Sequence, residues 1–211
     1  IRDRKKCSRF WIILFKTILS KLYHWKIYVV GSVEYQYPNH LFQAGYFLDK
    51  KYYDENTIDF KHLLLSEKNQ SLLKDIQNSN SVGVHIRRGD YMTKQNLVIF
   101  GNICTQKYYH DAIRIITEKV NDAVFYVFSD DISWVQTHLD IPNAVYVNWN
   151  TGESSIYDMY LMSSCKYNII ANSTFSYWAA RLNKKTNMVI YPSKWYNTFT
   201  PDIFPESWCG I

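Results

Sequence analysis

Short β-rich runs alternate with helix-like segments from residue 81 onward. The runs are apolar and rich in β-branched and aromatic residues, and they occupy residues 82–86, 124–129, 144–149, 167–171 and 188–192. The helix-like segments between them occupy residues 105–120, 131–139, 154–164 and 174–183. Strands that alternate with helices form βαβ units, and several of these runs are apolar on both faces, as a sheet covered by helices requires. The pattern therefore predicts an α/β fold with a mostly parallel sheet.

Residues 1–80 follow a different pattern from the rest of the chain. This part is aromatic and irregular, with helical periodicity near 8–24 and 59–77. Because the regular alternation starts only after this part, we predict a domain boundary there. The expected domains are residues 1–80 and residues 81–211.

An apolar stretch at residues 10–19 follows a basic N-terminal segment. Lys16 interrupts this stretch, which is too short to span a bilayer, since a spanning helix needs roughly 20 apolar residues. The favoured interpretation is an amphipathic helix, with a signal segment or a surface anchor as the alternative. Peripheral contact with a membrane stays open on this basis.

Charge and cysteine content limit the classes of partner. The chain of 211 residues carries 24 basic and 19 acidic residues, and this net charge of +5 favours anionic partners such as nucleotides or a membrane surface. The sequence has no zinc-finger or RNA-binding motif, so nucleic acid is not expected as a partner. The four cysteines lie far apart at positions 7, 104, 165 and 209, a spacing typical of free thiols in a reducing compartment.

Polar clusters follow four of the predicted strands at their carboxyl ends. They are Arg87-Arg88-Gly89-Asp90, Ser129-Asp130-Asp131, Asn148-Trp149-Asn150 and Asn172-Ser173-Thr174. In open α/β sheets, ligands bind beyond the carboxyl ends of the strands. Four clusters at one edge therefore predict a binding site there.

The arginine cluster has three interpretations. Arg87 and Arg88 alternate along the strand, so we expect one side chain to face a ligand and the other to brace the loop. A planar guanidinium suits a diphosphate, because it donates paired charged hydrogen bonds. The second interpretation is an ion pair with Asp90 that fixes the turn, and the third is an exposed Arg-Gly-Asp adhesion loop. The adhesion loop is disfavoured because the tripeptide directly follows a buried type of strand.

The other clusters leave structural and functional interpretations open. Asn172, Ser173 and Thr174 precede a helix whose free N–H groups would bind an anion, although Ser and Thr are also ordinary N-cap residues. Asp130 and Asp131 are candidate N-cap residues of the next helix as well. The sequence has no glycine-rich phosphate loop and no His, Cys or carboxylate cluster with metal-ligand spacing, so we expect neither a metal nor a cofactor.

Taken together, the motifs resemble those of the bacterial α-1,2-fucosyltransferases, glycosyltransferase family 11. The similarity rests on HIRRGDY at 85–91, FYVFSDDISWV at 125–135, the stretch from 148 to 182 and the ending YPSKWY…PESW. The segment AGYFLDKKYYDE at 44–55 is similar to the family segment before the arginine motif. The resemblance covers most of the chain.

The resemblance implies a GT-B arrangement, in which a Rossmann-like C-terminal domain holds GDP-fucose. The family opens on a strand and a GGLGNQ-type glycine loop that this sequence lacks, so we expect an N-terminally incomplete acceptor domain. The implied activity is inverting, metal-independent transfer of fucose to the 2-hydroxyl of a galactoside in a surface glycan or oligosaccharide. The alternatives are transfer from another GDP-sugar and a non-catalytic nucleotide-sugar-binding module. The expected location is the cytoplasm, with contact at the inner face of the bacterial membrane left open.

Site residues carry over from the family by motif. The residues expected to bind substrate are His85, Arg88, Asp130, Asp158, Ser173, Thr174 and Phe175, and those expected to act in catalysis are Arg87 and Asp90. The resemblance implies that Arg87 binds the β-phosphate of the donor and that Asp158 accepts hydrogen bonds from guanine. Residues 173–175 would line the phosphate and the fucose. Asp90 is the candidate general base.

Overall fold

The computed structural model describes residues 18, 21, 28–30, 42–44 and 59–211. Contacts divide the chain into two compact units, Ile1–Tyr53 and Asp54–Ile211. In the first unit, strand β1 (Tyr28–Val30) pairs in parallel with strand β2 (Phe42–Ala44).

Three features of the sequence lie outside the described residues, apart from a few single positions. They are the predicted helix near 8–24, the apolar stretch at 10–19 and the family-like segment at 44–55. Among the residues that are described, no helix is long and apolar enough to cross a membrane.

The second unit is built on a parallel sheet of six strands. The strands are β3 (Asn80–Ile86), β4 (Ala123–Ser129), β5 (Ala144–Val147), β6 (Tyr167–Ile169), β7 (Met188–Tyr191) and β8 (Cys209–Gly210). They lie in the order β5-β4-β3-β6-β7-β8, and every neighbouring pair is parallel. Counted along the chain from β3, this is the order 3-2-1-4-5-6 of doubly wound, Rossmann-type sheets. The predicted α/β class is confirmed, and the strand order reverses between β3 and β6.

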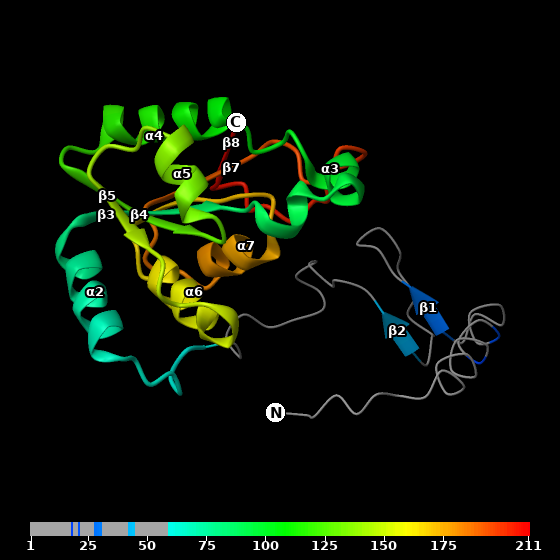
Figure 1. The fold of residues 1–211 in the computed structure, drawn as a ribbon, viewed down its shortest axis with the longest axis horizontal. Helices are drawn as coiled ribbons and strands as arrows, with labels where there is room; N and C mark the ends of the chain where they lie inside the picture. The colour runs from blue at the N-terminus through cyan, green and yellow to red at the C-terminus, as the bar shows by residue number, and fades with distance from the viewer. Residues whose placement is uncertain (1–17, 19–20, 22–27, 31–41, 45–58) are drawn as a thin grey trace. The chain divides into compact units, whose positions relative to one another are not determined.

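Helices cover both faces of this sheet (Figure 1). They are α2 (Glu67–Asn78), α3 (Lys94–Phe100), α4 (Gln106–Lys119), α5 (Ile132–His138), α6 (Ser155–Ser163) and α7 (Thr174–Arg181). Helices α4 and α5 pack on one face, and α2, α6 and α7 pack on the other. Helix α3 belongs to the long connection between β3 and α4. This layering explains why the predicted strands are apolar on both faces.

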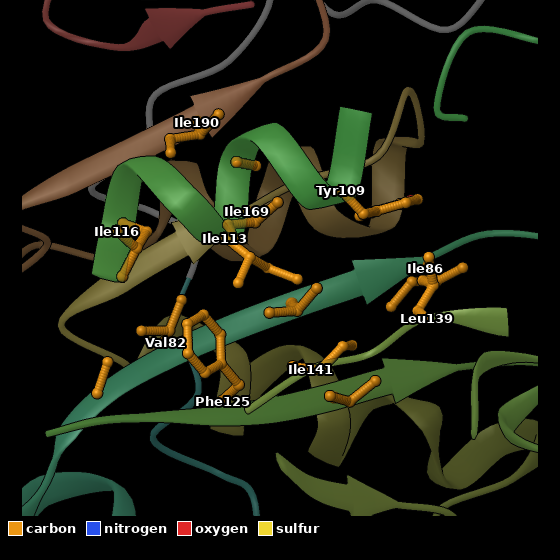
Figure 2. Close-up of a cluster of buried hydrophobic side chains, with 14 of the residues drawn as sticks. Val82, Ile86, Tyr109, Ile113, Ile116, Phe125, Leu139, Ile141, Ile169 and Ile190 are labelled. Carbon is orange, nitrogen blue, oxygen red and sulfur yellow. The ribbon is translucent and has the colours of Figure 1, made fainter. Parts of the chain in front are cut away.

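The larger core cluster lies between the sheet and helices α4 and α5 (Figure 2). Val82, Val84 and Ile86 of β3 are buried there together with Ile113 and Ile116 of α4. These β3 residues are spaced by two, so the intervening residues of the strand point to the opposite face. The alternation sets the direction of the side chains that follow the strand.

Helix α2 packs with the helices of the opposite face. Its Leu72 and Ile76 are buried in one cluster with Leu161 and Met162 of α6. The predicted boundary at residue 80 would separate α2 from these partners, whereas the compact unit includes it. The division of the chain into an acceptor part and a donor part stays a prediction.

Candidate functional site

The polar clusters that follow β3 and β6 meet where the strand order reverses. The Tyr91 hydroxyl donates a hydrogen bond of 2.9 Å to the Asn172 carbonyl oxygen, which joins the loop after β3 to the loop after β6. The ring centre of His85, near the end of β3, lies 5.0 Å from that of Phe175 in α7. The site is therefore assembled at the position where doubly wound sheets bind their ligands.

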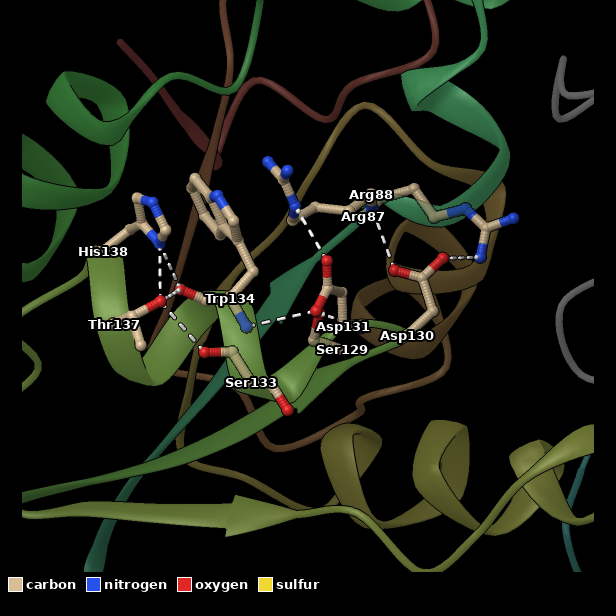
Figure 3. Close-up of polar contacts among 9 residues, drawn as sticks. All are labelled: Arg87, Arg88, Ser129, Asp130, Asp131, Ser133, Trp134, Thr137 and His138. Atoms are coloured by element: carbon tan, nitrogen blue, oxygen red, sulfur yellow. Dashed lines mark hydrogen bonds and ion pairs between the residues drawn. The ribbon is translucent and has the colours of Figure 1, made fainter.

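Two carboxylates hold the guanidinium of Arg87. Its Nη1 lies 2.6 Å from Oδ2 of Asp130, which follows β4. Figure 3 shows Arg87 and Asp130 joined by this contact. Its Nη2 lies 2.5 Å from Oδ1 of Asp90 in the 3-10 turn Gly89–Met92. The Arg87 side chain is still 32% exposed, so an anion can reach it. The predicted ion pair between the arginine motif and Asp90 is therefore present, and the phosphate-binding role of Arg87 stays a prediction.

Asp130 is the central hydrogen-bond partner of the arginine turn, residues 87–90. While Oδ2 binds Arg87, Oδ1 accepts a hydrogen bond of 2.9 Å from the backbone N–H of Arg88. The turn passes so close to this carboxylate that a Cβ atom on Gly89 would lie 2.4 Å from Oδ2. The position of Asp130 therefore explains the glycine in the motif. The sequence predicts substrate binding by Asp130, and in the structure both of its carboxylate oxygen atoms accept hydrogen bonds from Arg87 and Arg88.

Arg88 is directed away from Arg87, as Figure 3 shows. Its guanidinium carbon lies 3.6 Å from the ring centre of Trp134 in α5, and its Nε lies 3.3 Å from Oδ2 of Asp131. Asp131 is also the N-cap of α5, since its Oδ1 accepts a hydrogen bond of 3.1 Å from the Trp134 N–H. Arg88 therefore braces the loop, and its packing on a tryptophan argues against an exposed adhesion loop.

His85 is a buried, neutral side chain. Burial and, to a smaller degree, the charge of Arg87 lower the pKa of its imidazole from 6.5 to about 3. The side chain is 5% exposed, and its Nδ1 has no hydrogen-bond partner in the described part of the chain. At neutral pH, His85 therefore adds no positive charge to the site and presents a neutral ring beside Phe175.

The amino end of α7 lies on the same side as His85. Ser173 occupies the N-cap position, but its side chain makes no capping hydrogen bond, and Thr174 is the first residue of the helix. The preceding residue, Asn172, is fixed by a hydrogen bond of 3.0 Å from its side-chain amide to the Trp195 carbonyl oxygen. The first-turn N–H groups of α7 thus have no side-chain cap, which suits anion binding.

Asp158 lies in a buried cluster on α6. Burial raises the pKa of its carboxyl from 3.8 to about 7, and a hydrogen bond of 2.6 Å from Asn150 Nδ2 to its Oδ1 opposes that rise. The Asn150 amide exchanges two hydrogen bonds with the Asn69 amide of α2. The sequence places Asn150 at a strand end but carries no signal for Asn69, because 81 positions separate the two residues.

A cavity of about 230 Å³ opens beside the arginine turn. Its walls include Arg87, Arg88, Tyr91, Trp134 and Asn172. Cys104 also lines the cavity, but burial raises the pKa of its thiol to about 12, so this sulfur is no thiolate at neutral pH. The cavity therefore offers positive and aromatic surface rather than a nucleophile.

Apart from Arg88, which packs on Trp134 and pairs with Asp131, the predicted site residues form three groups. Arg87, Asp90 and Asp130 share one ion-pair cluster. His85 lies beside the start of α7, and Asp158 belongs to a separate buried cluster. Their roles in binding and catalysis stay predictions. In the described part of the chain, no three His, Cys, Asp or Glu side chains gather in a way that would hold a metal ion.

The strand order, with arginines and a helix end where it reverses, defines a Rossmann-type α/β protein. Comparison with known sequences is more specific. The chain belongs to glycosyl transferase family 11, whose family model matches residues 6–211. The family resemblance inferred from the motifs is confirmed.

Relatives of this chain include transferases of two sugars. An α-1,2-colitosyltransferase of Escherichia coli is 35% identical over 86% of this chain and 63% of its own length. The O-antigen biosynthesis glycosyltransferase WbnK of E. coli is 44% identical over 57% of this chain and 40% of its own length. Galactoside α-(1,2)-fucosyltransferase 2 of Pongo pygmaeus is 28% identical over 71% of this chain and 48% of its own length. The chain thus spans less than two thirds of each of these relatives.

A solved structure of the fucosyltransferase NodZ from Bradyrhizobium is a distant structural match. It covers 86% of this chain and 60% of that chain, with a TM-score of 0.44 and 15% identity. At this distance the match places no individual residue.

Proposed function

We propose that this protein is an inverting α-1,2-glycosyltransferase that moves fucose from GDP-fucose to the 2-hydroxyl of a galactoside. The observation that carries the proposal is the position of Arg87 and the amino end of α7 where the Rossmann-type sheet reverses its strand order. Membership of glycosyl transferase family 11 supports the reaction type. Two relatives, an α-1,2-colitosyltransferase and a galactoside α-(1,2)-fucosyltransferase, support the α-1,2 linkage.

In this mechanism, Arg87 and the α7 end stabilise the leaving diphosphate. Oxygen atoms of the β-phosphate would replace carboxylate oxygens at the Arg87 guanidinium, which now pairs with Asp90 and Asp130. Positive charge and free helix N–H groups stabilise a departing anion without a metal, so we expect no metal requirement. Asp158 would accept hydrogen bonds from the guanine N–H groups, and His85 would pack as a neutral ring.

The transfer step balances as a single displacement. The acceptor 2-hydroxyl oxygen attacks the anomeric carbon on the face opposite GDP, and the bond from that carbon to the β-phosphate oxygen breaks with its electron pair leaving on GDP. A base takes the hydroxyl proton, and we assign this role to Asp90. Its side chain is 58% exposed and contacts Arg87, so an acceptor can approach it next to the departing phosphate.

GDP-colitose is the second candidate donor. Colitose is fucose without the 3-hydroxyl, so one diphosphate and guanine site would serve both donors. The relative named an α-1,2-colitosyltransferase, 35% identical over 86% of this chain, favours this candidate. The preference between the two donors would then depend on groups around the 3-position of the sugar.

Calorimetric binding of GDP-fucose, GDP-colitose and GDP-mannose in EDTA tests the proposal. Arg87→Ala should weaken donor binding about 10- to 150-fold, because it removes a charged hydrogen-bonding contact of about 1.5–3 kcal/mol. Arg114→Ala is the matched control, since this arginine is 60% exposed on α4 and should leave binding unchanged. Equal affinities of Arg87→Ala and wild type would contradict the role of Arg87.

Transfer to a galactoside separates an enzyme from a binding module. Incorporation of labelled sugar into the acceptor in EDTA is the expected result. Donor binding without transfer would favour the non-catalytic module. Transfer that stops in EDTA and returns with magnesium would contradict the metal-free mechanism.

A further inference from the structure

Side chains from separate elements form one buried network beside α6. The amides of Asn69, on α2, and Asn150, after β5, exchange hydrogen bonds of 3.0 and 3.1 Å. Asn150 Nδ2 also donates a hydrogen bond of 2.6 Å to Oδ1 of Asp158. The side-chain oxygen of Asn69 accepts a further hydrogen bond of 2.8 Å from Trp149 Nε1. Asn69 is 1% exposed, so its amide is committed to this network rather than to water.

The network fixes the direction of each amide in turn. Trp149 Nε1 is a donor only, so it requires the oxygen atom of the Asn69 amide and leaves the Asn69 NH₂ for Asn150. That NH₂ requires the Asn150 oxygen atom, which leaves the Asn150 NH₂ for Asp158. A reversed Asn150 amide would place its oxygen atom against a carboxylate. The orientation of the Asn69 amide therefore determines that Oδ1 of Asp158 accepts a hydrogen bond from the Asn150 NH₂.

The carboxyl of Asp158 is left with one free oxygen atom. Within the described chain, Oδ2 makes no hydrogen bond and the carboxyl makes no ion pair. The nearby ammonium of Lys68 lies 3.7 Å from the ring centre of Trp149 instead. A buried carboxylate costs free energy unless its lone pairs are satisfied. A ligand with N–H donors would supply what the protein does not.

We propose that Asn69 is a positioning residue for the nucleobase of the donor. Acting through Asn150, it holds the Asp158 carboxyl so that Oδ2 faces adjacent N–H donors, the pattern that guanine presents and adenine lacks. The inference rests on the proposed function, in which Asp158 receives the base. Helix α2 lies in the part, residues 1–80, that the family resemblance implies is the acceptor domain, and it would then contribute to donor selectivity.

Binding of GDP and inosine diphosphate tests this role, because the two nucleotides differ by the 2-amino group of the base. Calorimetry would compare the wild-type chain with Asn69→Ala, Asn150→Ala and Ser71→Ala, an exposed α2 position that serves as the control. The wild type should prefer GDP about tenfold, as expected for one charged hydrogen bond. Both asparagine variants should reduce this preference to about threefold or less, and Ser71→Ala should retain it.

Each outcome decides between positioning and packing. A purely structural role would lower the affinities for both nucleotides by the same factor. An unchanged ratio of GDP affinity to inosine diphosphate affinity in a folded asparagine variant would therefore overturn the inference. Circular dichroism establishes whether each variant folds. If Asn69→Ala does not fold, Asn150→Ala removes the same hydrogen-bond connection to Asp158 by a substitution in a loop. A wild type that binds GDP without preference would overturn this inference and the contact of Asp158 with the 2-amino group, and leave the proposed transfer reaction intact. A wild type that binds neither nucleotide would overturn both.

Discussion

Replacement of Gly89 by alanine should dislodge Asp130 rather than strain the backbone. Gly89 does not adopt a positive φ, but its new Cβ atom would lie 2.4 Å from Oδ2 and 3.2 Å from Cγ of Asp130. The Asp130 side chain is 28% exposed, so it has room to rotate away. This rotation would break its hydrogen bonds to the Arg87 guanidinium and the Arg88 N–H.

The expected cost follows from these two hydrogen bonds. Hydrogen bonds to charged groups contribute about 1.5–3 kcal/mol, and partial exposure reduces each of these to about 1 kcal/mol. Gly89→Ala should therefore lower the free energy of unfolding by about 2 kcal/mol. The cost should be local to the arginine turn, because Asp130 contributes no side chain to either core cluster.

A double-mutant cycle in urea measures this coupling. Gly89→Ala and Asp130→Ala remove the same contacts, so the double variant should be no less stable than Asp130→Ala alone. Additive losses, about 4 kcal/mol in the double variant, would refute the reasoning, since Gly89 would then act independently of Asp130. An unchanged stability of Gly89→Ala would refute it as well.

Three further perturbations test the surroundings of the turn and the buried carboxyl. Trp134→Leu should lower the unfolding free energy by about 1 kcal/mol in urea titrations, because the stack on Arg88 at 3.6 Å is lost; no change would mean that Arg88 does not need the ring. Tyr91→Phe should cost about 1 kcal/mol in the same assay through the lost hydrogen bond to Asn172, and a neutral result would mean that this bond adds nothing over water. The protonated carboxyl of Asp158, with its pKa raised from 3.8 to about 7, stabilises the fold fully below about pH 4 and loses this effect as the pH rises through 7. Asp158→Asn should therefore flatten the decline of the urea midpoint between pH 4 and 8, and an equal decline in both proteins would contradict the assignment.

The fold of the second unit could be predicted because buried strands and amphipathic helices leave periodic patterns in the sequence. All five predicted strands are present, whereas β8 was missed because its two residues are too few to form a pattern. The helix predicted near 59–77 starts only at Glu67, because the Ser66 side chain accepts a hydrogen bond from the Asn69 N–H and caps the helix there. A cap depends on one side-chain contact, which hydrophobic periodicity does not report.

The pairing of the arginines with their carboxylates depends on sheet register, and a single sequence does not state register. Strand alternation predicted that Arg87 and Arg88 separate, but not which aspartates they meet. In the structure, β3 and β4 pair in parallel with Ile86 opposite Ser129, so the next two positions of each strand continue side by side. Arg87 thus meets Asp130, and Arg88 meets Asp131. The register turns two dipeptides 43 positions apart into two ion pairs, one at the proposed phosphate-binding arginine and one that braces the loop behind it.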